Sequence, residues 1–266
     1  MPDEPVLLVE REEHVVTLCI NLPSKRNFLT LECLKAIEEA LAGLTEDSAV
    51  RVLVLRGAGD RAFSSGYNIE ALRHVEHDLT AVDAGETLPL EKTLQAIEQF
   101  PRPVIAMLNG DAFGGGCELA MACDLRIAAA HARMGMPPAK LGLVYPYPGY
   151  RRFAAVLGLA RALELFLTAD TFDSRACLQM GLVHHVIPGE ELATFTYDLA
   201  RRIARNAPFS LAGTKRVLRT IAGGATLGRA EERALHALFH ASLKRRDIAE
   251  GIAAFAEKRT PVFTGE

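Results

Sequence analysis

Short, uninterrupted apolar runs alternate with amphipathic stretches along the first half of this 266-residue chain. Residues 52–55, 103–108 and 125–129 are almost wholly apolar, which is typical of strands buried on both faces of a sheet. Apolar residues at spacings of three and four predict a helix over residues 31–44, with Thr30 as its N-cap. Because strands and helices alternate, the sequence predicts an α/β fold.

Both ends of the chain depart from this alternation. Two β-rich runs, residues 6–9 and 15–20, flank a charged turn and predict an opening hairpin. After about Gly158 the pattern becomes mainly helical. Further helices are expected at residues 91–100, 159–167, 174–180, 190–205, 208–221, 231–243 and 247–258.

The charge balance excludes several classes of protein. The chain has 30 Lys and Arg residues against 33 Asp and Glu residues, a net charge of −3, which argues against a nucleic-acid or membrane-surface partner. No apolar run is long enough to span a membrane, and the chain starts with an acidic segment, so we expect a cytoplasmic protein. The five cysteines are scattered without a C-x-x-C pair, which predicts reduced, buried thiols.

A glycine-rich segment carries the strongest chemical signal. The predicted strand at 103–108 leads into Gly114, Gly115 and Gly116, and Glu118 falls in the first turn of the helix that follows. Glycines let a substrate approach the main chain closely, and a helix N-terminus offers N–H groups that stabilise an oxyanion. The same pattern also fits a tight strand-to-helix turn with a dipole-matched glutamate, so both interpretations stay open.

A second segment, residues 61–69, also leads from a buried strand through small residues toward a helix. Two such turns could place two backbone N–H groups around one oxygen. Neither segment has the G-x-G-x-x-G spacing or a following G-K-[ST], so a dinucleotide fold or a P-loop is not expected.

These two segments together resemble the crotonase (enoyl-CoA hydratase/isomerase) superfamily. Residues 62–69, AFSSGYNI, resemble its A-F-x-A-G-x-D-[IL] segment, and residues 109–124 resemble its N-G-x-x-x-G-G-G-x-E-L-x-x-x-C-D segment. The likeness continues at residues 21–27, 141–143 and 255–263, and thus spans almost the whole chain.

The resemblance implies a spiral of ββα units over residues 1–200 and a helical region for trimer formation over residues 201–266. It also implies an acyl-CoA thioester substrate, a homotrimer or a hexamer built from two trimers, and no metal or organic cofactor beyond the coenzyme A moiety. The N–H groups of Tyr67 and Gly115 are the implied donors to the thioester oxygen.

The same segments supply the residues that the resemblance places along the coenzyme A thioester. Lys25 and Arg26 lie in the early loop that runs near the nucleotide end in the family, where they could meet phosphate charges or simply be exposed. The other positions are Ala62, Ser64, Ser65, Gly66, Asn68, Ile69, Gly114, Pro137 and Leu141. Asn68 replaces the usual aspartate of its segment, and we expect it to cap a helix.

Departures from the family pattern bear on the reaction. Hydratases of the family use Glu118 together with a second glutamate from a later [QS]-x-P-E-x-x-x-G segment, where this chain has Pro138. Proline cannot transfer a proton, and positioned acid–base groups contribute about 10²–10⁴-fold in rate. Hydration by two glutamates is therefore expected to be seriously impaired.

The stretch 136–145 resembles the methylmalonyl-CoA decarboxylase branch of the family, which also lacks the second glutamate and has a tyrosine at the position of Tyr145. In that chemistry Glu118 would orient the substrate or relay a proton. Tyr145 would hydrogen-bond the departing carboxylate or deliver the proton. The alternative is that Tyr145 belongs to a packed loop of tyrosines and prolines.

The leading prediction is an enzyme that stabilises an acyl-CoA enolate and decarboxylates a malonyl-type thioester. Isomerisation of an enoyl-CoA by Glu118 alone comes second and hydration third. A non-catalytic acyl-CoA-binding protein is the alternative of another class. Two histidine pairs, His74 with His77 and His236 with His240, have the spacing of metal ligands but no third ligand nearby, so no metal site is expected.

Overall fold

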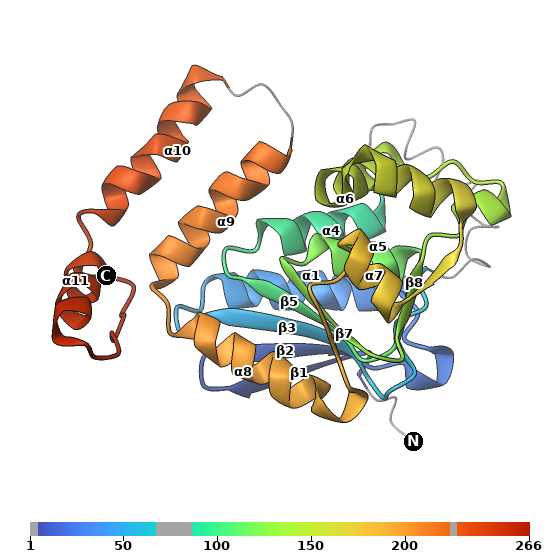
Figure 1. The fold of residues 1–266 in the computed structure, drawn as a ribbon, viewed down its shortest axis with the longest axis horizontal. Helices are drawn as coiled ribbons and strands as arrows, with labels where there is room; N and C mark the ends of the chain where they lie inside the picture. The colour runs from blue at the N-terminus through green and yellow to red at the C-terminus, as the bar shows by residue number, and fades with distance from the viewer. Residues whose placement is uncertain (1–4, 68–86, 224–227) are drawn as a thin grey trace.

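The computed structural model describes residues 5–67, 87–223 and 228–266, and within them two sheets form the centre of the molecule (Figure 1). The larger sheet has the order β1 (Leu7–Glu12), β2 (Val15–Ile20), β3 (Val52–Gly57), β5 (Val104–Leu108), β7 (Leu125–Ala129) and β10 (His185–Ile187). The smaller sheet has the order β4 (Ala62–Ser64), β6 (Asp111–Phe113), β8 (Arg133–Gly135) and β9 (Thr171–Asp173). The pairs β1–β2 and β8–β9 are antiparallel, and the other pairs are parallel.

Successive repeats each add one strand to each sheet. β3 is followed by β4, β5 by β6, and β7 by β8, with a helix after β6 and after β8. The chain thus climbs as a spiral of ββα units, which confirms the predicted α/β class. The uninterrupted apolar runs form β3, β5 and β7, whose apolar side chains are almost all buried because the sheet is covered on both faces.

Helices cover the two faces of the larger sheet. α1 (Leu31–Thr45) and α4 (Pro89–Gln99) lie on one face, and α8 (Leu192–Ala204) packs on the other against β2, β3, β5 and β7 (Figure 1). Thr30 caps α1 as predicted, since its hydroxyl accepts a hydrogen bond from the Cys33 N–H at 3.0 Å. α5 (Gly115–Ala122) is buried along its whole length between α4 and α6 (Tyr147–Thr168).

The helical part of the chain begins earlier than predicted. α6 runs over Tyr147–Thr168 with a kink at Gly158, where the backbone has φ 73° and ψ 165°. The helix predicted from residue 159 is the part of α6 that follows this kink, and the helical part before Gly158 was not predicted. The prolines before and within the first turn of α6 do not prevent a helix there, because the first N–H groups of a helix need no partner within it. α7 (Ser174–Met180) then ends at Gly181, as predicted.

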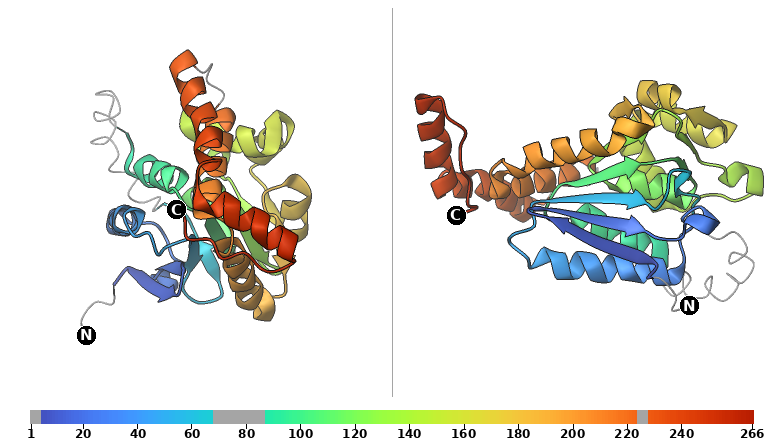
Figure 2. Two further views of the ribbon diagram at one scale, coloured as in Figure 1. Left: turned by 90° about the vertical axis from the view of Figure 1, so that its left-hand side faces the viewer. Right: turned by 90° about the horizontal axis from the view of Figure 1, so that it is seen from below.

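The carboxy-terminal helices extend away from the sheets (Figure 2). They are α9 (Pro208–Ala222), α10 (Arg229–Ser242) and α11 (Arg246–Glu257). Apolar side chains on them are exposed, among them Leu218, Ile221, Phe239, Ile252 and Phe255. A surface of this kind is typical of an interaction face, and the trimer or hexamer stays a prediction.

The five cysteines are free and buried, as predicted. Burial raises the pKa of the Cys33 thiol to about 12, so the thiol is neutral at physiological pH. Over the described ranges, no helix is both long enough and apolar enough to cross a bilayer.

Candidate active site

The two glycine-containing segments of the sequence meet at the start of α5. Gly66 has φ +94°, and a Cβ built on it would lie 2.5 Å from the Phe113 carbonyl oxygen and 3.1 Å from the Gly115 nitrogen. A Cβ built on Gly115 would lie 3.3 Å from the Tyr67 nitrogen. The backbone nitrogens of Tyr67 and Gly115 are therefore near neighbours. Because residues 66 and 115 are both glycines, neither contributes a side chain to the space between these nitrogens.

Hydrogen bonds fix this arrangement. The Ser64 hydroxyl accepts from the Gly66 N–H at 3.2 Å, and the Gly66 carbonyl accepts from the Leu29 N–H at 2.8 Å. Gly115 is the first residue of α5, where backbone N–H groups have no acceptor within the helix and carry the positive end of its dipole. Two neighbouring backbone amides are the groups that an oxyanion hole uses, and that role for Tyr67 and Gly115 stays a prediction.

Two buried asparagines hold the adjacent loops. Asn27 donates from Nδ2 to the carbonyl oxygens of Ala58 and Ala62 at 2.9 and 2.7 Å. Asn109 accepts the Gly57 N–H at 3.0 Å and donates to the Gly59 carbonyl oxygen at 2.8 Å. Both asparagines occur in the segments that resemble the crotonase superfamily, and here their hydrogen bonds hold the loops near the two amides.

Glu118 lies one turn into α5 and is only 3% exposed. Both of its carboxylate oxygens are engaged: Tyr145 donates its hydroxyl to Oε2 at 2.6 Å, and Arg152 donates from Nη1 to Oε1 at 2.5 Å. Burial raises the pKa of Glu118, while Arg152 and the Tyr145 hydrogen bond oppose that rise. The Glu118 carboxyl group is therefore held in one orientation by two groups: Tyr145, with which it can share a proton, and the fixed cation Arg152.

Tyr145 sits in an aromatic cluster and against a glycine. Its ring lies 6.2 Å from that of Tyr150 and 5.8 Å from that of Phe166, and its N–H donates to the Tyr150 hydroxyl at 3.1 Å. Burial and the neighbouring Glu118 carboxylate raise the pKa of Tyr145 well above the usual value. Tyr145 packs among aromatic rings, as the packed-loop alternative predicts, and this packing directs its hydroxyl at Glu118. Its catalytic role stays a prediction.

A glycine on α6 makes room for this pair. A Cβ on Gly149 would lie 2.5 Å from Cε1 of Tyr145 and 2.8 Å from Oε1 of Glu118. We expect Gly149→Ala to destabilise the protein by about 1–3 kcal/mol, because the confined ring cannot move aside freely. Activity should fall as well, because the Tyr145–Glu118 hydrogen bond is displaced.

Urea denaturation and steady-state kinetics measure these two effects. Gly43→Ala is the matched control, since Gly43 lies in the interior of α1 with nothing within 4 Å of its added methyl. That control should gain about 0.5–1 kcal/mol in stability and keep its activity. If both variants behaved alike, Gly149 would not be supporting the pair.

The remaining predicted positions lie around these elements. Pro138 is buried at the start of a short 3-10 helix, Pro138–Leu141, which Pro137 precedes and in which Leu141 is half exposed. Lys25 and Arg26 are exposed at the end of the 3-10 helix Pro23–Lys25, and the Lys25 ammonium lies 5.4 Å from the Phe28 ring centre.

The other predicted positions lie either in helices and strands named above or outside the described residues. Ala62 and Ser64 belong to β4, Ser65 follows it, and Gly114 is the N-cap of α5. Asn68, Ile69 and the pair His74 and His77 lie outside the described residues. Among the residues that are described, no cluster of three or more His, Cys, Asp and Glu side chains is arranged to hold a metal ion.

Sequence reasoning missed Arg152 and its other partners. Arg152 is 5% exposed and donates to Glu98 Oε1 at 2.8 Å and to Glu91 Oε1 at 3.2 Å, in addition to Glu118. Glu91 and Glu98 are two turns apart on α4, and therefore lie on one face of that helix. That spacing was the available signal, but it does not indicate which cation the two carboxylates meet.

Comparison with known proteins identifies the family of the chain. Residues 10–266 match the family described as enoyl-CoA hydratase/isomerase. The chain is 34% identical over 261 residues to a crotonyl-CoA hydratase of Syntrophomonas wolfei, covering 97% of both chains. It is 31% identical over 252 residues to a methylmalonyl-CoA decarboxylase of Escherichia coli, covering 94% of this chain and 95% of that protein.

Solved structures agree in fold as well as in sequence. An enoyl-CoA hydratase/carnithine racemase from Magnetospirillum magneticum superposes with a TM-score of 0.90 at 31% identity, covering 99% of this chain and 97% of that one. An enoyl-CoA hydratase from Bacillus anthracis gives a TM-score of 0.85 at 31% identity, covering 98% of this chain and all of that one. By sequence along nearly its whole length, and by fold, the chain belongs to the enoyl-CoA hydratase/isomerase family, the crotonase superfamily.

Proposed function

We propose that this protein decarboxylates a malonyl-type coenzyme A thioester. Membership of the enoyl-CoA hydratase/isomerase family supports an enzyme acting on an acyl-CoA. The adjacent amides of Tyr67 and Gly115 support stabilisation of a thioester enolate, because an oxyanion between them would meet two N–H donors. The reaction is then decided by the groups that can move a proton beside that enolate.

The engagement of both Glu118 oxygens is the observation that carries this proposal. An isomerase that used Glu118 alone would need a carboxylate free to take a proton from one carbon and give it to another. Here Oε1 is held by Arg152 and Oε2 by Tyr145. An arrangement of this kind suits the delivery of a single proton, which is what a decarboxylase needs after carbon dioxide has left.

In the proposed reaction the bond between Cα and the carboxylate breaks, carbon dioxide leaves, and the electron pair of that bond moves onto the thioester as an enolate. The N–H groups of Tyr67 and Gly115 donate to the enolate oxygen. A proton then passes from the Tyr145–Glu118 pair to Cα, which gives the shortened acyl-CoA. Since burial and Glu118 disfavour a phenolate at Tyr145, the pair reacts best when Glu118 is protonated and replaces the proton that Tyr145 gives.

Hydration is the second candidate, and one observation favours it: several relatives of similar identity, including the one from Syntrophomonas wolfei, are named as hydratases. Against it stands Pro138, which occupies the position of the second glutamate in the sequence pattern and has no group that transfers a proton. A non-catalytic acyl-CoA-binding protein is disfavoured by the hydrogen-bonded Tyr145–Glu118 pair, which such a protein would not need.

Mass spectrometry of purified protein with separate acyl-CoA thioesters tests the proposal. We expect methylmalonyl-CoA or ethylmalonyl-CoA to lose carbon dioxide, and crotonyl-CoA and a 3-enoyl-CoA to react much more slowly. Efficient addition of water to crotonyl-CoA would replace the proposal with hydration. Tight binding of every thioester without turnover would favour the non-catalytic alternative.

The reaction should slow as the pH rises. Burial raises the pKa of Glu118 above its ordinary value of 4.5, so its neutral form persists to higher pH than in a free glutamate. Because the proposed step uses that neutral form, we expect kcat/KM to fall through an apparent pKa above 4.5. A pH profile measured with a malonyl-type thioester checks this, and a profile that rises with pH would contradict it.

A further inference from the structure

Arg152 is a buried cation at the centre of three carboxylates. Its side chain is 3% exposed, and those of Glu118, Glu91 and Glu98 are 4%, 11% and 21% exposed. Burial lowers the pKa of Arg152, but hydrogen bonds and charges from Glu98 and Glu118 more than offset this, so Arg152 stays charged. A buried ion of this kind persists only when its donors are satisfied, which the three carboxylates achieve.

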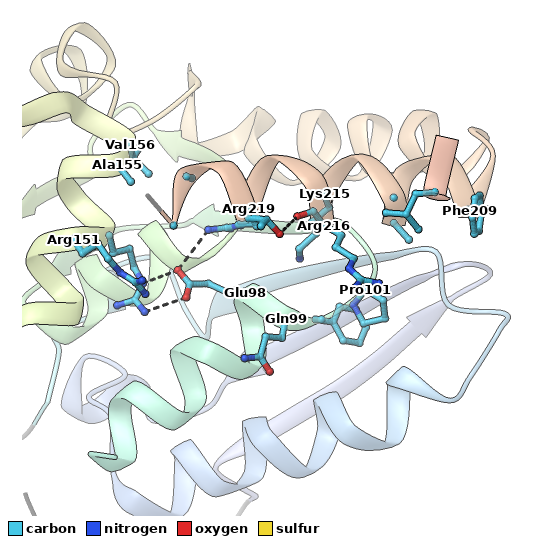
Figure 3. Close-up of a pocket in the computed structure, with 18 residues that line it drawn as sticks. Glu98, Gln99, Pro101, Arg151, Ala155, Val156, Phe209, Lys215, Arg216 and Arg219 are labelled. Carbon is cyan, nitrogen blue, oxygen red and sulfur yellow. Dashed lines mark hydrogen bonds and ion pairs between the residues drawn. The ribbon is translucent and has the colours of Figure 1, made fainter. Parts of the chain in front are cut away.

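Arg152 is connected through Glu98 to a second group of charged residues. Glu98 contacts both Arg152 and Arg219. Glu98 and Arg219 lie at the wall of a cavity of about 600 Å³ between α4, α6 and α9 (Figure 3). Arg219 lies 3.5 Å from Glu98 and 2.9 Å from Asp124, and Lys215 lies 2.8 Å from Asp124. The network of ion pairs therefore runs from Glu118 on α5 through α6 and α4 to the basic residues of α9.

The balance of charge within this network leaves one carboxylate in excess. The described cluster contains the cations Arg152, Lys215 and Arg219 and the carboxylates Glu91, Glu98, Glu118 and Asp124. Excess negative charge costs most where burial is deepest, and Glu118 is the least exposed of the four. Burial raises the pKa of Glu118, which favours its protonated form, and Arg152 is the group that most strongly opposes this.

We propose that Arg152 is a positioning residue for the reaction: its bond to Oε1 fixes the Glu118 carboxyl group so that Oε2 faces Tyr145, and it sets how readily that group carries a proton. The planar guanidinium meets three carboxylates in fixed directions, which a lysine ammonium cannot reproduce. Only the expected effect of Arg152 on the reaction rate rests on the proposed function. The ionisation of Glu118 can be measured without turnover.

The groups that face Glu118 come from each element packed against it. They are Arg152 on α6, Tyr145 before α6, Glu91 on α4 and Cys117 on α5. Arg152 favours the ionised form of Glu118, whereas Glu91 disfavours it. Neutralising Arg152 and neutralising Glu91 should therefore move the titration of Glu118 in opposite directions.

Carbon-13 NMR of glutamate-labelled protein, with Glu118→Gln to assign the signal, measures this titration. We expect Arg152→Gln to raise the midpoint of Glu118 and Glu91→Gln to lower it, relative to the unchanged protein. Arg151→Gln is the matched control, because Arg151 is the exposed neighbour on the same helix and should leave the midpoint unchanged. Coincident titrations of all variants would overturn the inference.

Kinetics of the same variants on a malonyl-type thioester give a second readout. Arg152→Gln should lower kcat by about 10²-fold with little change in KM, since a misplaced group impairs the chemical step. Arg152→Lys should recover part of that loss, and the pH profile should shift with the titration of Glu118. A loss confined to KM, or an unshifted profile, would overturn the inference.

The two experiments separate this inference from the proposed function. If no thioester is decarboxylated but the titrations move as stated, the inference holds and the proposed reaction fails. If Arg152→Gln does not fold, Arg152→Lys takes its place: a raised midpoint for Glu118 supports the inference, and an unchanged midpoint overturns it.

Discussion

We expect Glu118→Gln to lower kcat/KM for the acyl-CoA reaction by about 10²–10⁴-fold, the range that a positioned acid–base group supplies. Glutamine keeps the size of the side chain and can still accept the hydrogen bond from Tyr145, but it has no carboxyl proton to give. Arg152 keeps its two partners on α4 in this variant, which preserves the fold around it. Steady-state kinetics of the purified variant measure the loss.

Glu39→Gln is the matched control for this loss, since Glu39 is exposed on α1, away from the Tyr145–Glu118 pair. It removes the same charge and should leave kcat/KM unchanged. Thermal unfolding of both variants shows whether either change affects folding. If Glu118→Gln kept near-full activity while folded, the proton would have to come from another group.

Gly115→Pro should be the second severe change, with a loss of about 10²–10³-fold in kcat, the effect of removing one oxyanion donor. Proline lacks the N–H that we assign to the enolate oxygen, and its ring occupies the space of that hydrogen. The first position of a helix otherwise accepts proline well, so α5 can still form.

Gly115→Ala separates loss of the donor from crowding. Alanine retains the N–H, and its Cβ would lie 3.1 Å from Cδ2 of Leu90 and 3.3 Å from the Tyr67 nitrogen, which is close for both variants. We expect the alanine variant to lose much less activity than the proline variant. Equal losses in the two variants would mean that the space at Gly115 matters and its N–H does not.

The long elements of the fold follow from local sequence, whereas the short ones do not. β3, β5 and β7 are uninterrupted apolar runs, and α1 has both an apolar stripe and a capping threonine. In the smaller sheet, β4, β6, β8 and β9 have three residues each, too few for a period to be visible. These strands form because the spiral brings successive repeats side by side, which is a tertiary effect.

The candidate site divides in the same way. The amides of Tyr67 and Gly115 and the carboxyl group of Glu118 lie within two short segments whose pattern predicted them. The hydrogen bond between Tyr145 and Glu118 joins residues 27 apart, so the sequence indicated both groups but not their contact. Arg152 escaped notice because its partners come from α4 and α5, and only the packing of those helices against α6 brings the charges together.

The most direct test of the proposed function is to incubate the protein with methylmalonyl-CoA in deuterium oxide. Mass spectrometry then identifies the acyl-CoA product, and the carbon dioxide released is measured. We predict one carbon dioxide for each thioester consumed, and a shortened acyl-CoA with one solvent deuterium on Cα, because the enolate takes its proton from exchangeable groups. The thioester left intact, with crotonyl-CoA hydrated rapidly by the same preparation, would contradict the account.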